Sequence, residues 1–113
     1  MTSDTICAPA TASGGALCVV RVAGPEAITV ADRVFTPRHG EALRGRAGYT
    51  LVFGDVRRSD GSLVDEVVVS VFRAPHSYTG EDSVEISCHG SAYIVSELMT
   101  RLVEAGCRMA RPG

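Results

Sequence analysis

The chain has 113 residues, a formal net charge of −2 and 45% hydrophobic residues, enough for one compact domain with an apolar core. Its basic residues are scattered, so no positive stripe of the kind that holds a phosphate backbone is expected, and direct nucleic-acid binding by this segment is not favoured. All 11 basic residues are arginine, which excludes a P-loop lysine, a Schiff-base lysine and a lysine general base within the chain.

The first half of the sequence predicts two strands and a helix. A short strand is expected over residues 5–8, and a long apolar strand over residues 16–23, where β-branched neighbours surround a single charge, Arg21. Gly24-Pro25 then opens a helix that runs to about Phe35, because proline is tolerated in a first helical turn and the apolar residues recur at helical spacing.

The middle of the sequence predicts a hairpin. Residues 36–48 combine proline, glycine and charge, and we expect them to form an exposed connection. Strands are expected over residues 49–57 and 63–73, since Ser59-Asp60-Gly61-Ser62 between them has the turn chemistry of antiparallel partners. A loop over residues 74–80 leads to the next strand.

The last part of the sequence predicts an acidic strand, Asp82 to His89, and then the clearest helix. That helix starts at Gly90-Ser91 and ends at Gly106, and its polar face places Glu97 one turn from Arg101, a spacing that favours an ion pair. Its expected apolar stripe consists of Ile94, Val95, Leu98, Met99, Leu102 and Val103.

Residues 107–110 can begin a further strand. The turn signal Arg111-Pro112-Gly113 has no element after it, which indicates a fragment of a longer protein. The element order predicts an α+β fold: a two-layer sandwich with one mixed or antiparallel sheet, two helices on a single face, and a single domain over residues 1–113. The other sheet face then needs a partner unless it is polar.

The cysteines and the first residues of the chain indicate the cellular compartment. Cys7, Cys18, Cys88 and Cys107 have no Cys-x-x-Cys spacing, and we predict buried thiols that serve packing, with a reactive thiol or an accidental disulfide as alternatives. A reducing cytoplasm fits such thiols. The chain begins without a signal-like segment and has no apolar run long enough for a bilayer, so we expect no membrane contact.

Two charges stand in strands that are otherwise apolar, Arg21 and Glu85, and we take them as the candidate binding residues. Ionised groups are costly to bury, so each needs a reason. One alternative is a cross-strand ion pair with a structural role. The other is a ligand site in which Glu85 accepts N–H groups of a heterocycle and Arg21 donates to an anionic or carbonyl group.

Alternation in the acidic strand places Val84, Ile86 and Cys88 on one face and a polar set on the other face: Ser83, Glu85, Ser87 and His89. His89 is either an acid/base group or a strand-end histidine bonded to a loop carbonyl. It points away from Cys88, which excludes a thiolate pair between these neighbours. No Cys/His cluster has ligand spacing, so neither a metal site nor a catalytic residue is predicted.

Two glycine pairs have weaker implications. Gly14-Gly15 precedes a strand, the reverse of the order in a dinucleotide-binding turn, and we interpret it as a hinge or a close backbone approach. Gly90-Ser91 precedes a helix whose N-terminus could hold an anion, although capping by Ser91 is the simpler interpretation.

Four separated motifs, in order along the whole chain, closely resemble the N-terminal domain of the tRNA-modification GTPases of the MnmE/TrmE type. They are Asp4–Thr11, Gly15–Gly24, Ser77-Tyr78-Thr79-Gly80-Glu81-Asp82 through His89-Gly90, and Ala110–Gly113. The resemblance implies a fold similar to the folate-binding part of aminomethyltransferases, a homodimer, and binding of 5-formyltetrahydrofolate through Arg21 and Glu85. A further folate contact, a lysine, is implied beyond residue 113.

For the longer parent protein, the resemblance implies GTP hydrolysis with Mg²⁺ and K⁺ in a separate domain. It also implies a FAD-dependent partner protein and the formation of a carboxymethylaminomethyl group on the wobble uridine of tRNA, which this segment would contact only indirectly. Two alternatives remain for the segment itself: a folate-dependent one-carbon transferase, and a purely structural assembly domain in which Arg21 and Glu85 only pair.

Overall fold

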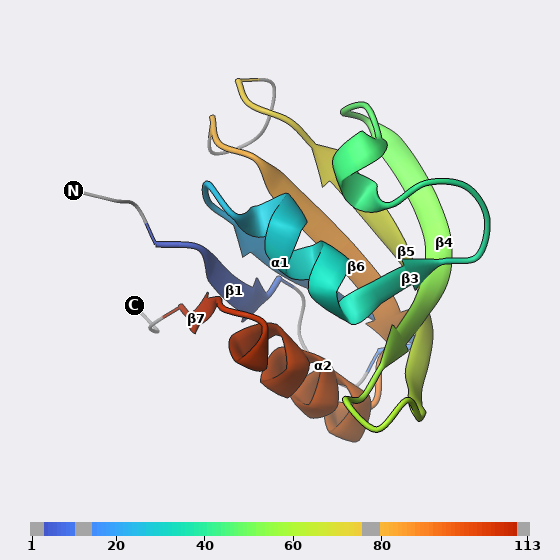
Figure 1. The fold of residues 1–113 in the computed structure, drawn as a ribbon. Helices are drawn as coiled ribbons and strands as arrows, with labels where there is room; N and C mark the ends of the chain where they lie inside the picture. Colours follow the sequence, from blue (N-terminus) through green and yellow to red (C-terminus); the bar gives the residue numbers. More distant parts are fainter. Residues whose placement is uncertain (1–3, 11–14, 76–79, 111–113) are drawn as a thin grey trace.

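The computed structural model describes residues 4–10, 15–75 and 80–110. These residues form one seven-stranded sheet, two α-helices and a 3-10 turn (Figure 1). The strands are β1 (Ile6–Pro9), β2 (Leu17–Ala23), β3 (Phe35–Pro37), β4 (Thr50–Arg57), β5 (Leu63–Phe72), β6 (Ser83–His89) and β7 (Arg108–Met109). The helical elements are α1 (Ala27–Val34), η1 (Leu43–Gly45) and α2 (Ala92–Glu104).

The sheet has the strand order β3-β4-β5-β6-β2-β1-β7. Its neighbouring strands pair antiparallel except at one edge, where β1 and β7 run parallel. The sheet is therefore mixed, and the predicted α+β class is confirmed. The short strand expected after the second helix is also present, as β7.

Both helices cover the same face of the sheet (Figure 1). The apolar stripe of α1 is buried from Ala27 to Val34, and α2 buries Val95, Leu98, Met99 and Leu102. These side chains pack on inward residues of the central strands, chiefly Val20, Val22, Val67, Val69, Val71, Val84 and Ile86, each at most 2% exposed. One core between two layers results, as predicted. Val103 departs from the expected stripe and is 43% exposed.

Residues 36–48 were expected to form an exposed connection, and this prediction is wrong. Its first residues extend β3, which pairs with β4, and Leu43 in η1 is fully buried. The carboxylate of Asp32 in α1 accepts hydrogen bonds from the backbone N–H groups of Leu43 (2.7 Å) and Arg44 (3.0 Å). The Asp32 carboxylate thus holds η1 against the core. Asp32 lies outside residues 36–48, so the sequence of this segment does not reveal the contact.

At the turn between β6 and α2, the backbone of Gly90 lies in close contact with the backbone of Gly15. The N–H of Gly90 donates to the carbonyl of Ala16 (3.0 Å), and a Cβ added at Gly90 would overlap the carbonyl oxygen of Gly15. The predicted close approach is therefore confirmed at Gly15. Ser91 caps α2 by accepting from the N–H of Ile94 (3.3 Å), as expected.

Some predictions fall on residues outside the described ranges. These are parts of the two predicted loops, at residues 11–14 and 76–79, and the chain ends at residues 1–3 and 111–113, including the final turn signal.

Candidate functional site

The sheet face opposite the helices, here called the open face, carries the outward residues of β1, β2, β4, β5 and β6. In the described part of the chain no helix covers it (Figure 1). The strand registers place one row of side chains across five strands: Leu51, Ser70, Glu85, Arg21 and Ala8. The two isolated charges identified in the sequence are thus direct cross-strand neighbours at the centre of this face.

Arg21 and Glu85 form a close ion pair. Nε and Nη2 of Arg21 donate to Oε2 of Glu85 at 3.0 and 2.7 Å. The side chains are 40% and 20% exposed, so solvent screens the attraction, and such a pair contributes about 1 kcal/mol or less. The cross-strand ion pair, one of the two alternatives for these charges, is therefore present. Both side chains are also partly exposed on the open face.

A hollow of about 240 Å³ lies beside Arg21. Its walls are mainly aliphatic and come from β1 and β2, including Ile6, Ala8 and Ala23. Ligand pockets usually have volumes of about 300–1,000 Å³, so this hollow suits one flat ring system and not a whole extended molecule. Among the described residues that line it, Arg21 is the charged one, and Glu85 reaches the recess only through its pairing with Arg21. A mainly apolar recess with a few polar groups is the usual composition of a small-molecule site.

Large apolar side chains are exposed elsewhere on the open face, on β2 and β4. Leu51 is 70% exposed, Leu17 63% and Phe53 47%, and the guanidinium of Arg38 lies 5.0 Å from the centre of the Phe53 ring. Several large apolar side chains exposed on one face are typical of a surface that contacts a partner.

His89 lies at the far end of β6, four residues or about 13 Å along the strand from Glu85. Its partner is Asp65, so the alternative of a bond to a loop carbonyl is wrong: Asp65 accepts from the backbone N–H and from Nδ1 of His89, both at 2.8 Å. The ring of His89 is 65% exposed, so this bond lies at the surface. Cys88 is buried on the opposite face, as predicted.

A larger hollow, about 600 Å³, lies on the other side of the molecule. It is lined mainly by α2, with Met99 and Val103 among its residues, and by Met109. Neither Arg21 nor Glu85 borders it, and among the described residues that line it Glu104 is the charged one. It lies away from both candidate residues, so the smaller recess beside Arg21 on the open face is the better candidate.

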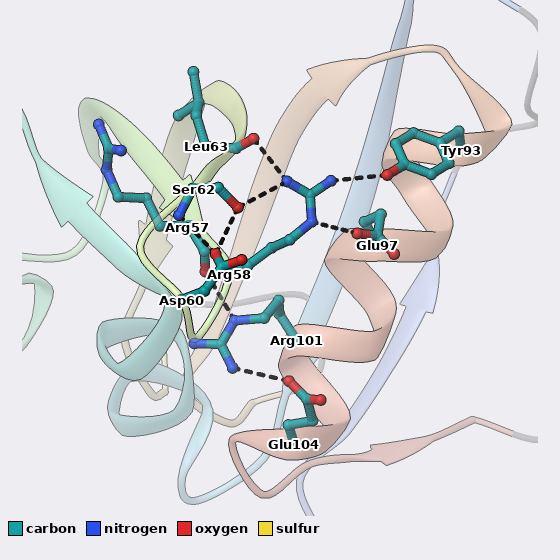
Figure 2. A network of polar contacts seen from close by, with 9 residues as sticks. All are labelled: Arg57, Arg58, Asp60, Ser62, Leu63, Tyr93, Glu97, Arg101 and Glu104. Atoms are coloured by element: carbon teal, nitrogen blue, oxygen red, sulfur yellow. Dashed lines mark hydrogen bonds and ion pairs between the residues drawn. The ribbon is translucent and has the colours of Figure 1, made fainter.

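The turn between β4 and β5 is tied to α2 by Arg58, a residue that sequence analysis did not single out (Figure 2). Its guanidinium donates to Glu97 (2.6 Å), to the hydroxyl of Tyr93 (2.9 Å) and to the carbonyl of Leu63 (3.0 Å). The hydrogen bonds with Glu97 hold the pKa of Arg58 above its ordinary value.

The expected Glu97–Arg101 pair is wrong, because each residue has another partner in this network (Figure 2). Glu97 accepts from Arg58, while Arg101 donates to Glu104 (3.0 Å) and to the carbonyl of Arg57 (2.8 Å). The side chains of Arg58 and Arg101 hold the turn against the helix, so the network is structural.

Comparison with known proteins decides the family. The family model described as "GTP-binding protein TrmE N-terminus" matches residues 5–113. The chain belongs to this TrmE N-terminal family. The resemblance drawn from the four motifs is thereby confirmed.

Relatives named "tRNA modification GTPase MnmE" match the whole chain. The protein of Bacteroides fragilis is 57% identical over 114 residues, that of Bacteroides thetaiotaomicron 55%, and that of Symbiobacterium thermophilum 43%. Each match covers 100% of this chain, and the chain spans about a quarter of these relatives' length, 24–25%. Among the described helices of this TrmE N-terminal chain, none is long and apolar enough to cross a membrane.

Proposed function

We propose that this TrmE N-terminal chain binds 5-formyltetrahydrofolate on its open face and forms a homodimer through that face. The observation that carries the proposal is the partly exposed Arg21–Glu85 pair, whose arginine borders an aliphatic recess. These are the two residues that the family resemblance implies as folate contacts, and the fold similarity to aminomethyltransferases is part of the same proposal.

The hydrogen-bond geometry of Glu85 suits this role. Both bonds from Arg21 end on Oε2, so neither of them uses Oε1. Glu85 can therefore keep Arg21 on one oxygen and accept an N–H from the guanidine-like edge of a pterin on the other. Arg21 holds the carboxylate in place and borders the recess, where the family resemblance implies that it contacts the ligand.

The recess supplies the apolar part of the site. A pterin ring is flat and fits against Ile6 and Ala8, while the rest of a folate would extend over the open face. That extension brings the ligand close to the exposed Leu51 and Phe53, where a second copy of the chain would cover it. Ligand binding and dimerisation are thereby proposed for one continuous surface.

The activity of the longer protein follows from the relatives' printed name, and we extend it to this chain only as a proposal. A GTPase domain using Mg²⁺ and K⁺, a FAD-dependent partner and tRNA wobble-uridine modification would belong to regions outside these residues. The folate domain would hold the one-carbon unit, and the assembly would act in the cytoplasm, where tRNA is modified.

A purely structural assembly domain is the second candidate. It is favoured by the same ion pair, since Arg21 and Glu85 already satisfy each other at 2.7 Å. The two candidates differ in what happens when the pair is broken: a structural pair affects only stability, whereas a binding pair affects affinity for folate.

Calorimetric titration with 5-formyltetrahydrofolate separates them. We expect saturable binding to the wild type and at least a tenfold weaker affinity, about 1.4 kcal/mol, in Glu85→Gln and in Arg21→Met. The matched control is Asp55→Asn, which breaks the 2.7 Å ion pair of Arg38 on the same sheet without touching the recess. Its affinity should equal that of the wild type.

The oligomeric state is measured by light scattering in the same samples. If Glu85→Gln and Arg21→Met both bind 5-formyltetrahydrofolate as tightly as the wild type, the proposed folate site is rejected. A stable dimer with no folate binding in the wild type would favour the structural assembly domain.

A further inference from the structure

The four cysteines form two buried pairs, and the two pairs differ. Cys18 and Cys88 lie directly opposite each other in the β2–β6 ladder, and each is 1% exposed. Cys7 of β1 and Cys107, which follows α2, are 100 residues apart in sequence, yet the thiol of Cys107 donates to the sulfur of Cys7 at 2.7 Å. None of the four is in a disulfide.

The backbone around Cys107 holds its sulfur against Cys7. The N–H of Cys107 donates to the carbonyl of Leu102, which closes the end of α2. The next residues pair with β1, because Arg108 donates to the carbonyl of Thr5 and Ala110 donates to the carbonyl of Cys7, both at 2.9 Å. A covalent S–S bond is about 2.0 Å long, so bond formation needs an approach of only about 0.7 Å.

The pairs also differ in how readily a thiolate forms. The bond donated by Cys107 lowers the pKa of Cys7, whereas that bond and burial raise the pKa of Cys107. Burial raises the pKa of Cys88 to about 11. Cys7 is therefore the thiol that ionises most readily in the first pair, and it has an adjacent partner.

Access to the first pair lies at the edge of the sheet. β7 has two residues and contacts a single neighbouring strand, β1. Short edge elements of this kind open at low free-energy cost, so a small reagent can reach the sulfurs during local opening. Cys18 and Cys88 lie in the central strands β2 and β6 and are each 1% exposed, although Cys18 also lines the larger hollow beside α2.

We propose that Cys7 and Cys107 are a redox-active dithiol, which a peroxide converts to a disulfide that fastens β1 to the end of α2. The Cys7 thiolate attacks one peroxide oxygen, the O–O bond breaks, and hydroxide leaves, which forms a sulfenic acid. The sulfur of Cys107 then attacks the sulfur of Cys7 and water leaves with the Cys107 proton. In total, two thiols and hydrogen peroxide give one disulfide and two water molecules.

The consequence is a reversible lock between segments 100 residues apart in the chain. Closing so long a loop restricts the unfolded chain, so the oxidised form should melt at a higher temperature than the reduced form. A dithiol reagent restores the original state.

The test uses the wild-type chain and hydrogen peroxide. The native protein is treated, unfolded in acid, labelled with a maleimide, and mapped by mass spectrometry. We expect loss of labelling at Cys7 and Cys107, a cross-linked peptide that joins them, a mass decrease of two hydrogen atoms, and full reversal by dithiothreitol.

Two variants provide the controls. Cys107→Ser should prevent the cross-link and leave Cys7 as a single oxidised thiol, whereas Cys18→Ala should form the cross-link as the wild type does. Continued labelling of all four cysteines after treatment would overturn the proposal, as would a cross-link between Cys18 and Cys88 in place of the expected one. Because the wild-type map is decisive by itself, a variant that failed to fold would not remove the test.

Discussion

Asp65 and His89 are joined by two hydrogen bonds of 2.8 Å, one from the backbone N–H of His89 and one from Nδ1 of its ring. Asp65 is 8% exposed, whereas the ring of His89 is 65% exposed. The carboxylate therefore satisfies a backbone group at the end of the β5–β6 pair, and the ring bond adds orientation at the surface.

This difference in burial predicts unequal costs of substitution. Asp65→Ala leaves the N–H of His89 without its acceptor, which should lower the free energy of unfolding by about 1–3 kcal/mol. His89→Ala keeps the backbone bond and should cost about 0.5 kcal/mol or less, as is usual at exposed positions. Denaturant titrations of both variants check this. Equal losses would show that the ring bond matters as much as the backbone bond.

Gly90→Ala should be among the most damaging substitutions in the chain. The added Cβ overlaps the carbonyl oxygen of Gly15, and neither backbone segment can move without disturbing the β2–β6 pair. We expect a loss of about 2–4 kcal/mol in the free energy of unfolding.

The partner glycine is the control for that substitution. A Cβ at Gly15 meets its nearest atom, the carbonyl oxygen of Leu17, at 3.6 Å, an ordinary contact. Gly15→Ala should therefore leave stability nearly unchanged. Comparable destabilisation by the two substitutions would contradict the steric explanation.

Arg58 should contribute more to thermal stability than its neighbour Arg57. The side chain of Arg58 connects the β4–β5 turn to Glu97 and Tyr93 of α2. The hydrogen bonds that the Arg57 side chain donates to Gly61 and Asp55 stay within the hairpin, and its backbone carbonyl still accepts from Arg101 after substitution. Arg58→Met should lower the melting temperature by several degrees, and Arg57→Met should lower it less. Calorimetric melting of the two variants gives the comparison, and the reverse order would mean that the turn does not depend on α2.

Acid stability should depend on Asp55. Hydrogen bonds from Arg38, and to a lesser extent Arg57, hold the pKa of Asp55 below its ordinary value. A pKa that is lower in the folded state stabilises the fold above the unfolded pKa, about 4, and this stabilisation disappears as pH falls through the folded pKa.

Asp55→Asn should therefore be less stable than the wild type near pH 7, and the difference should shrink as pH falls below about 4. Melting temperatures measured across this range test the prediction. A difference that stays constant with pH would mean that the ion pair with Arg38 does not account for the stability of the wild type.

The sequence predicts those elements whose signals are local. Alternation along β6 separates Val84 and Ile86 from Glu85, and this pattern needs only the two-residue period of a strand. The turn at Asp60-Gly61 is also local, since Gly61 adopts a positive φ of 91° that glycine permits. The two helices have apolar stripes of their own.

Elements that depend on distant partners could not be predicted in this way. Leu43 lies in a segment rich in glycine and charge, and it is buried because Asp32 accepts its N–H from another element. Glu97 has a suitable partner at Arg101 in sequence, but Arg58 reaches it from the hairpin instead. Local spacing does not encode which of two arginines is nearer in space.

The candidate site likewise combines features that the sequence reveals with features that depend on distant strands. Arg21 and Glu85 stand out as single charges in apolar strands, which a sequence reveals, but their direct opposition depends on the register of β2 and β6. The recess beside Arg21 depends further on β1, whose Ala8 is the register partner of Arg21. Three strands must be placed before the site exists.

The central claim is that folate binds on the open face, and its most direct test is chemical-shift mapping by NMR. The labelled chain is titrated with 5-formyltetrahydrofolate and the backbone amide shifts are followed. We expect the largest changes at Arg21, Glu85 and Ala8, with Met99 and Val103 of the larger hollow unaffected. Changes concentrated along α2, or no changes at saturating ligand, would contradict it.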